Sequence, residues 1–342
     1  MFKRILVPLD GSTRAEQAIP VAARIARALG DSVILLRVVT TPVDYGPSTT
    51  APATNANETI NADLAEAASY LEKMAKSDEL VGIATEVKTL FGAAAPTILS
   101  SAQSFHASII VMCSHGYTGF KRWVLGSVAD KVTHYSPIPV LVLREGGPVP
   151  ATAVQQPVRA LVSVDGSPLS EAVLEPAAYL AAALAQATSQ QGALHLLRVV
   201  DLPATGGKFK SDAHIDTGVK EQVKHEDEMY LATLTNRLRQ GDLANLDLSI
   251  TSSVEVDPDV AEAIVKKAEQ EKFDFIAMAT HGRGGVQNWA MGSVSTRVLH
   301  ATRVPLLIMR PQDVQVKLES KGKEKAEGEV VIIETTEVHV ES

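Results

Sequence analysis

The sequence predicts an α/β protein of two similar domains in tandem, each built on a doubly wound, five-stranded parallel sheet. Three observations support this fold class. The chain has 342 residues, 45% of them hydrophobic, which is enough for two cores at about 150 residues per domain. Its motifs occur twice, and short apolar segments alternate with longer helical patterns. Such alternation is typical of a parallel sheet covered by helices.

The internal repeat sets the number of domains. Each motif of the first half returns in the second half, in the same order. The repeated motifs are Asp-Gly-Ser at 10–12 and 165–167, Leu-Leu-Arg-Val-Val at 35–39 and 196–200, and His-Gly-x9-Gly-Ser-Val at 115–128 and 281–294. Equal internal spacing is rare in unrelated segments, so we expect two copies of one domain.

Five apolar segments predict the strands of the first copy, at 3–9, 32–39, 84–90, 107–113 and 138–143, with helices between them. Ile109–Met112 and its counterpart Phe275–Ala279 are apolar throughout, which predicts central strands buried on both faces. In a doubly wound sheet, ligands bind beyond the carboxyl ends of the strands, where the strand order reverses. We therefore expect the candidate sites at that edge.

Composition predicts a linker at 147–157 between domains at 1–146 and 158–312, and long loops before a helix at 41–56 and 203–218. The linker is rich in Gly, Pro and polar residues and has no hydrophobic period. From residue 313 the chain carries four Lys against eight Asp and Glu. The tail at 313–342 is therefore predicted to be largely disordered.

Charge and cysteine content exclude several classes of protein. With 32 Lys and Arg against 40 Asp and Glu, the net charge of −8 repels phosphate backbones and anionic lipid, so we expect neither nucleic-acid nor membrane binding. One cysteine cannot form an internal disulfide, and the N-terminus lacks the apolar segment of a signal peptide. The apolar stretch 177–185 is far shorter than the about 20 residues that span a bilayer. We expect a soluble, cytoplasmic protein.

Glycine and serine residues after the fourth strand of each copy predict a phosphate site. Gly116 and Gly282 follow a buried strand, while Gly126-Ser127 and Gly292-Ser293 stand at the start of a helix. Glycine lets the backbone approach a ligand, and a helix N-terminus offers unpaired N–H groups with about half a positive charge. Together they suit phosphate. The alternative is that each serine is only an N-cap, and the double occurrence of the motif favours phosphate.

Acidic and apolar residues at the ends of the first two strands complete the pattern. Asp10 and Asp165 are each followed by Gly-Ser, so both carboxylates lie at the same sheet edge as the glycines. They can accept hydrogen bonds from ribose hydroxyls or an adenine amine, or instead cap the helices that follow. Val38 and Val199 end the second strand, where they flank a base and also belong to the sheet core.

With these residues the chain resembles a tandem universal stress protein, with one family domain in each copy. Nucleotide-binding members of that family carry Gly-x2-Gly-x9-Gly-(Ser/Thr), and the resemblance implies an adenine nucleotide alpha hydrolase-like fold. It also implies bound ATP, or AMP or ADP, with Mg²⁺ or Mn²⁺ held by the phosphates. The matching positions are Asp10, Val38, Met112, Gly116, Gly126 and Ser127 in the first copy, and Asp165, Val199, Met278, Gly282, Gly292 and Ser293 in the second.

One position departs from the family pattern. The first glycine is Cys113 in the first copy and Ala279 in the second, and both side chains add bulk where the ligand approaches. The second site, with a single methyl group, is the better candidate. Cys113 is expected to fill space rather than to react. His115 and His281 have no Cys, His or carboxylate at ligand spacing, so we expect no metal held by protein side chains.

These features favour an ATP-binding regulatory or stress-response protein. The sequence has no Gly-x4-Gly-Lys-(Ser/Thr) loop to place a lysine on the terminal phosphates, so hydrolysis is expected to be slow and no catalytic residue is assigned. Two alternatives stay open. One is an interaction module that binds no nucleotide, and the other is an adenine-nucleotide hydrolase, although adenylating relatives carry a Ser-Gly-Gly-x-Asp-Ser loop that this chain lacks.

The last strand of each copy predicts how the halves assemble. Segments 138–143 and 304–309 are apolar and carry a proline as their second residue. An exposed apolar edge strand favours association with a partner, and the resemblance implies that these strands pair across a two-fold axis. We expect a pseudo-dimer of the two halves within one chain. Whether the chain forms a further homodimer stays open.

Overall fold

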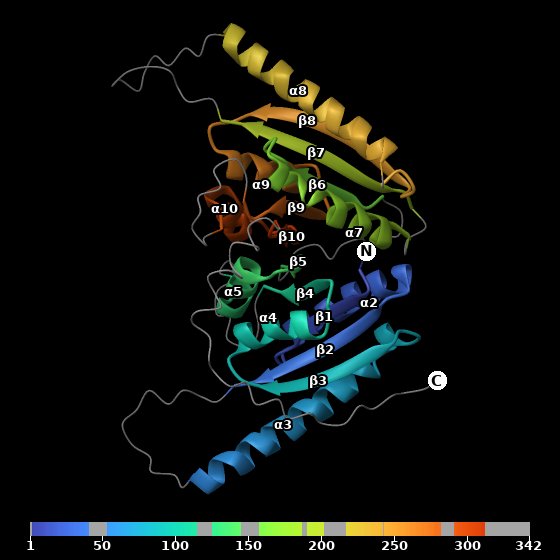
Figure 1. Ribbon diagram of the computed structural model, residues 1–342, viewed down its shortest axis with the longest axis vertical. Helices are drawn as coiled ribbons and strands as arrows, with labels where there is room; N and C mark the ends of the chain where they lie inside the picture. Colours follow the sequence, from blue (N-terminus) through green and yellow to red (C-terminus); the bar gives the residue numbers. More distant parts are fainter. Residues whose placement is uncertain are drawn as a thin grey trace, which may run out of the picture. The chain divides into compact units, whose positions relative to one another are not determined.

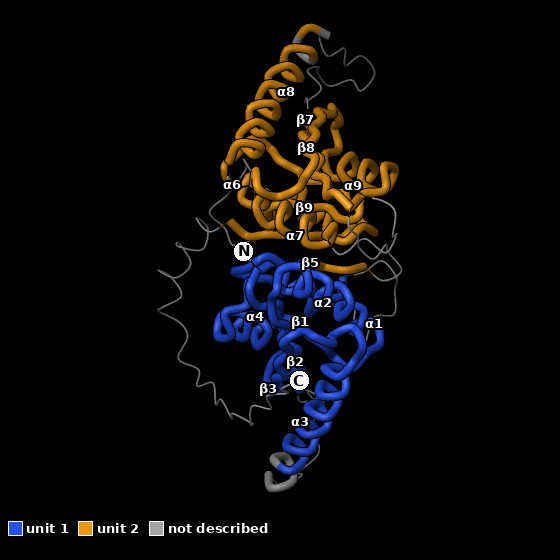
Figure 2. Tube along the Cα trace, turned by 90° about the vertical axis from the view of Figure 1, so that its right-hand side faces the viewer, with its two compact units in different colours: residues 1–141, 312–342 blue, residues 142–311 orange. Residues whose placement is uncertain are grey.

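The computed structural model describes residues 2–40, 53–114, 125–144, 157–186, 190–201, 217–241, 243–281 and 291–311. The described chain divides into two compact units, within residues 1–141 and 142–311 (Figure 2). The predicted tail and all but one residue of the predicted linker lie outside the described residues. The domain boundaries therefore stay predictions.

The first unit contains a parallel sheet with the strand order β3-β2-β1-β4. Its strands are β1 (Arg4–Pro8), β2 (Ser32–Val39), β3 (Thr85–Phe91), β4 (Ile109–Cys113) and, at the division between the units, β5 (Val140–Leu143). Its helices are α1 (Thr13–Glu16), α2 (Ala18–Leu29), α3 (Ala53–Ala75), the 3-10 helix η1 (Asp78–Leu80), α4 (Ala94–Ser104) and α5 (Ser127–Tyr135). Pro139, just before β5, accepts a hydrogen bond from the N–H of Ile110 in β4 at 2.9 Å. The long helix α3 runs along the outer strand β3 (Figure 1).

The second unit repeats this arrangement, with the strand order β10-β9-β6-β7-β8. Its strands are β6 (Arg159–Ser163), β7 (Gly192–Val200), β8 (Leu248–Val256), β9 (Phe275–Ala279) and β10 (Leu306–Met309). Its helices are α6 (Pro168–Glu171), α7 (Leu174–Gln186), α8 (Thr217–Gln240), α9 (Val260–Gln270) and α10 (Ser293–Ala301). Helix α8 lies along β8 as α3 lies along β3 (Figure 1).

The predicted fold class is confirmed, and the reason is visible in the central strands. Ile5, Leu6 and Val7 of β1 are fully buried, because strands flank β1 on both edges and helices cover its faces. The chain builds β1, β2 and β3 in one direction and then returns to β4 on the other side of β1. The strand order therefore reverses between β1 and β4, and the carboxyl ends of these two strands diverge around a crevice.

Two smaller expectations need correction. The loops predicted at 41–56 and 203–218 end earlier than expected, because α3 begins at Ala53 and α8 at Thr217. Alanine is the strongest helix former, so the alanine-rich start of α3 joins the helix in spite of the neighbouring Thr and Asn residues. The rest of both loops lies outside the described residues. None of the described helices is both long enough and apolar enough to cross a membrane.

Candidate functional site

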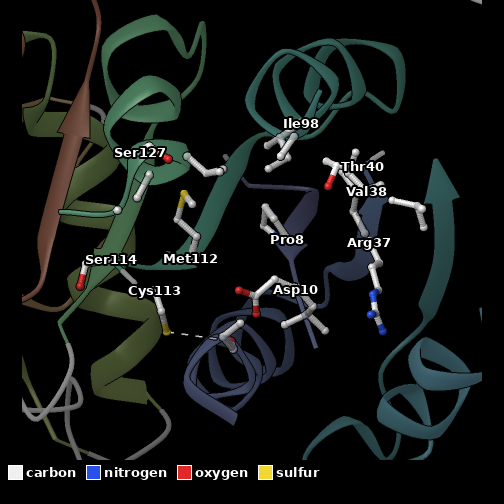
Figure 3. A pocket seen from close by; sticks show the side chains of 18 of the residues that line it. Pro8, Asp10, Arg37, Val38, Thr40, Ile98, Met112, Cys113, Ser114 and Ser127 are labelled. Carbon is white, nitrogen blue, oxygen red and sulfur yellow. Dashed lines mark hydrogen bonds between the residues drawn. The ribbon is translucent and has the colours of Figure 1, made fainter. Parts of the chain in front are cut away.

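A cavity of about 480 Å³ lies in the first unit at the carboxyl ends of β1, β2 and β4 (Figure 3). This volume is within the range of roughly 300–1,000 Å³ that is usual for small-molecule sites. The cavity occupies the edge at which the strand order reverses, as the sequence predicts. The predicted site residues that line it are Asp10, Val38, Met112, Cys113, Gly126 and Ser127.

Apolar side chains form the middle of the cavity wall. Val38 at the end of β2 is partly exposed, and Ile98 of α4 and Met112 of β4 are 4% and 5% exposed. In Figure 3 these side chains surround the space above Pro8. They come from three neighbouring elements and make the middle of the cavity apolar.

Asp10 is fixed by the turn that it opens. One carboxylate oxygen, Oδ1, accepts hydrogen bonds from the N–H of Ser12 at 3.0 Å and from its hydroxyl at 2.6 Å. The Ser12 hydroxyl in turn accepts from the N–H of Ala15 at 3.2 Å and caps α1. The alternative that Asp10 itself caps the helix is therefore wrong. Gly11 has φ +88°, a left-handed conformation that favours glycine at this tight turn.

The second unit repeats the same turn. Oδ1 of Asp165 accepts from the N–H of Ser167 at 2.9 Å and from its hydroxyl at 2.6 Å. Ser167 then caps α6 by accepting from the N–H of Ser170 at 3.2 Å. Both aspartates thus hold the serine that caps the helix, and both lie at the carboxyl end of the first strand of their unit.

The start of α5 differs from the sequence prediction by one residue. Gly126 is the N-cap and Ser127 the first helical residue, so the interpretation of the serine as an N-cap is wrong. The N–H of Gly126 donates to the carbonyl of Ser114 at 2.8 Å, and the first helical bond runs from Asp130 N–H to Gly126 at 2.9 Å. Among the described residues no side chain caps α5, so the N–H groups of its first turn keep the partial positive charge of a helix start.

The helix that begins at Gly292 in the second unit has the same geometry. The N–H of Gly292 donates to the carbonyl of Thr280 at 2.8 Å, and Thr296 N–H donates to the Gly292 carbonyl at 2.9 Å. Gly292 is the N-cap of α10, again without a side-chain cap, and Ser293 is the first helical residue. In both units the residue after the fourth strand, Ser114 or Thr280, thus accepts a hydrogen bond from the glycine at the helix start.

The remaining predicted residues are buried, partly exposed or outside the described residues. Val199, Met278 and Ala279 are 4%, 5% and 7% exposed, so they belong to the core at the strand ends of the second unit. The sulfur of Cys113, which is partly exposed, lies 3.9 Å from the carbonyl oxygen of Ala15. Nδ1 of His281 lies 2.8 Å from the hydroxyl oxygen of Thr280. His115, Gly116 and Gly282 lie outside the described residues.

Sequence reasoning missed several residues that line the cavity, among them Arg37, Asp63 and Glu66. Arg37 lies in the repeated Leu-Leu-Arg-Val-Val motif, which could have drawn attention to it. Asp63 and Glu66 are three residues apart on α3 and so share one face of that helix. No motif or repeat in the sequence points to these two residues.

The cavity has two chemically different ends (Figure 3). Ser127 and the start of α5 lie on the side opposite Val38 and Arg37, and Asp10 lies between them. At one end the start of α5 presents hydrogen-bond donors, in the middle Asp10 presents acceptors, and the other end has the apolar Val38 beside Arg37. A molecule with an anionic end, hydrogen-bond donors in its middle and an apolar ring fits this arrangement, with its anionic end at α5.

Comparisons with known proteins agree with the repeat. Residues 1–144 and 158–310 each match the model of the universal stress protein family. A universal stress protein of Mycobacterium tuberculosis is 27% identical over 317 residues, which cover 90% of this chain and 96% of that protein. One of Methanocaldococcus jannaschii is 34% identical over 146 residues, 42% of this chain and 84% of that protein. The crystal structure of a universal stress protein from Archaeoglobus fulgidus has a similar fold, with a TM-score of 0.54 and 22% identity over 90% of this chain and 96% of that chain.

Proposed function

The chain belongs to the universal stress protein family, and we propose that it is a nucleotide-dependent regulatory or stress-response factor that binds ATP, or ADP or AMP, in each unit. The observation that carries this proposal is the cavity, which has hydrogen-bond donors at one end, the acceptor Asp10 in the middle and an apolar wall, and so suits the parts of an adenine nucleotide. Adenine and ribose offer an amine and hydroxyls as donors, whereas the phosphates offer only acceptors. The same turn and the same helix start in the second unit support a second site there.

In the proposed complex, adenine lies against Val38 and Met112, and Asp10 accepts hydrogen bonds from the amine or the ribose. The phosphates lie at the N–H groups that open α5, with the exposed Ser127 hydroxyl as a further donor. Mg²⁺ or Mn²⁺ would be held by the phosphates themselves. In the second unit the corresponding groups are Asp165, Val199, Met278 and the start of α10 at Ser293.

We propose binding without dedicated catalysis, because the sequence lacks the lysine-bearing phosphate loop of hydrolytic enzymes. We further propose that the last strands of the two halves pair as a pseudo-dimer within the chain. A protein that responds to ATP is expected in the cytoplasm, where ATP is abundant.

Titration of the purified protein with Mg-ATP by calorimetry tests the proposal. Ser127→Glu and Ser293→Glu each place a carboxylate at the first position of a helix, where it stabilises the helix but repels phosphate. We expect two sites in the wild-type protein, one in each single variant and none in the double variant. Val81→Glu adds the same charge at an exposed residue next to the amino end of β3, at the far edge of the sheet, and should keep both sites.

An interaction module without nucleotide is the second candidate, and Cys113 favours it, since its side chain lines the cavity at a position where the family pattern has glycine. Mass spectrometry of small molecules released from the denatured protein distinguishes the two. Co-purified adenine nucleotide supports the first candidate. Unchanged ATP binding in both Ser→Glu variants contradicts the proposed location of the phosphates.

A further inference from the structure

We infer that Tyr70 and Tyr230 are positioning residues for the two nucleotide sites, because each holds in place the short helix that carries the Asp-Gly-Ser turn. The inference rests on the proposed function. Tyr70 is on α3 and is not among the residues that line the cavity. Its hydroxyl donates to Oε1 of Glu16, the last residue of α1, at 2.9 Å. In the second unit Tyr230 donates to Oε1 of Glu171, the last residue of α6, at 2.8 Å.

The tyrosine contact adds to what holds the short helices in place. Helices α1 and α6 have four residues each, about one turn, and a single turn has little stability of its own. One end of each is fixed by the capping serine that the aspartate holds. The other end continues through Gln17 or Ala172, both with helical backbone angles, towards α2 or α7, and the glutamate that the tyrosine holds adds a contact to α3 or α8. The orientation of Asp10 therefore depends on α3, although Asp10 and Tyr70 lie far apart in the sequence.

The surroundings of Tyr70 keep its hydroxyl protonated, so that it can donate its hydrogen bond to Glu16. Burial, and then the bond to Glu16, raise the pKa of Tyr70, so its hydroxyl stays protonated at neutral pH. The guanidinium of Arg37 lies over the Tyr70 ring, 5.0 Å from its centre. A Cβ atom at Gly11 would lie 3.2 Å from the same guanidinium, so Arg37 is packed between the ring and the turn. The three groups form one contact layer that joins α3 to the Asp10 turn.

In the second unit, charged side chains add to the contacts that hold the Asp165 turn. Arg237 pairs with Glu171, the same carboxylate that Tyr230 binds. Arg198, the counterpart of Arg37, forms an ion pair with Asp227 of α8 at 3.2 Å. The position that corresponds to Asp227 in the first unit is Ala67, which is buried. Loss of the tyrosine hydroxyl should therefore matter more in the first unit than in the second.

The test uses Tyr70→Phe and Tyr230→Phe in the full chain, which remove the hydroxyl and keep the ring. We expect Tyr70→Phe to weaken Mg-ATP binding at the first site about tenfold, as for the loss of a hydrogen bond to a charged group. Binding of inorganic tripolyphosphate, which contacts only the helix start, should stay unchanged.

A smaller loss is expected for Tyr230→Phe, because Arg237 still holds Glu171. Tyr179→Phe on α7, with no hydroxyl partner among the described residues, is the matched control and should bind as the wild type.

Two further measurements separate positioning from general destabilisation. Glu16→Gln keeps an oxygen acceptor for Tyr70 and should restore most of the affinity that Glu16→Ala loses. Hydrogen exchange of the peptide 10–17, measured without nucleotide, should be faster in Tyr70→Phe than in the wild type. Equal loss of ATP and tripolyphosphate binding, or unchanged exchange, overturns the inference. A wild-type protein that binds no ATP overturns the proposed function, and hydrogen exchange then still decides whether Tyr70 holds the turn.

Discussion

At the scale of single residues, the glycine at the start of α10 has a role in packing as well as the predicted role in ligand approach. A Cβ atom at Gly292 would lie 3.1 Å from the carbonyl oxygen of Thr280, to which the N–H of Gly292 donates. The hydroxyl of Ser295 donates to the same carbonyl at 3.0 Å. A side chain at position 292 would therefore disturb both hydrogen bonds even in the absence of a ligand.

Gly292→Ala is expected to lower the free energy of unfolding by about 1 kcal/mol. This is the typical net contribution of one hydrogen bond, and the added methyl group would disturb the bond to the Thr280 carbonyl. Urea denaturation without nucleotide measures this change. Ser293→Ala, one residue further along, should stay within about 0.5 kcal/mol of the wild type, because its exposed side chain does not cap the helix. Equal stabilities of the two variants would show that the packing at Gly292 is not limiting.

His195 gives the second prediction at this scale. Its Nδ1 and Nε2 lie 2.8 Å from the hydroxyl oxygens of Thr251 and Ser253 on β8. Burial, followed by the positive charge of Lys267, lowers the pKa of His195, while Glu271 and Glu255 oppose this shift and Arg159 adds to it. The folded protein thus takes up this proton less readily than the unfolded chain.

The sign of the pH dependence follows from that difference. Below the unfolded pKa of 6.5, the unfolded chain binds a proton that the folded protein does not, so stability falls as the pH drops from there to the lower folded pKa. The loss should be below about 1 kcal/mol, since the ring is only half-buried and partly screened by solvent. His195→Gln should reduce the difference in stability between pH 7.5 and 5.5. A difference as large as that of the wild type would contradict this role.

At the scale of elements, a buried ion pair attaches α8 to β7. The side chains of Arg198 and Asp227 are 10% and 12% exposed, and Nε and Oδ1 lie 3.2 Å apart without the alignment of a hydrogen bond. Asp227→Ala leaves a buried positive charge without its partner, so we expect a loss of about 3 kcal/mol in the free energy of unfolding. Thermal or urea denaturation measures it.

The double variant Arg198→Met with Asp227→Ala serves as the control, because it removes the buried charge together with its partner. It should recover most of the stability that Asp227→Ala loses. A single variant that loses less than about 0.5 kcal/mol, as is usual for exposed pairs, would mean that solvent reaches this pair. A double variant no more stable than the single one would mean that packing, not charge, carries the loss.

The sequence predicts the strands well, because their runs of apolar residues stand out from the rest of the chain. The strands of the first copy lie within two residues of the predicted ranges. In a central strand such as β4, burial on both faces requires apolar residues throughout, which makes the strand easy to recognise. Asp10 and Val38 were found because they end such strands. The contact of Tyr70 with Glu16 was not, since it depends on how α3 sits against α1. Comparison of the two copies could have drawn attention to these residues, because Glu16 and Tyr70 correspond to Glu171 and Tyr230, but the repeat does not show that the two side chains meet.

At the scale of the whole molecule, the assembly of the two halves is the main prediction that rests on sequence alone. Each half ends in a short strand of apolar residues, β5 and β10. An isolated edge strand of this kind favours association, so we expect the halves to stay together when the linker is cut. A protease recognition sequence inserted within 147–157 tests this without any change to a described strand or helix.

After cleavage, the two fragments should elute together from a size-exclusion column at the volume of the uncut chain of 36.4 kDa. The same insertion without added protease is the control for the insertion itself. Co-elution that persists in 1 M salt would indicate an apolar contact, because salt at that concentration screens charges beyond about 3 Å. Two separate fragments at low protein concentration would show that only the linker holds the halves together, and each nucleotide site would then have to act within its own half.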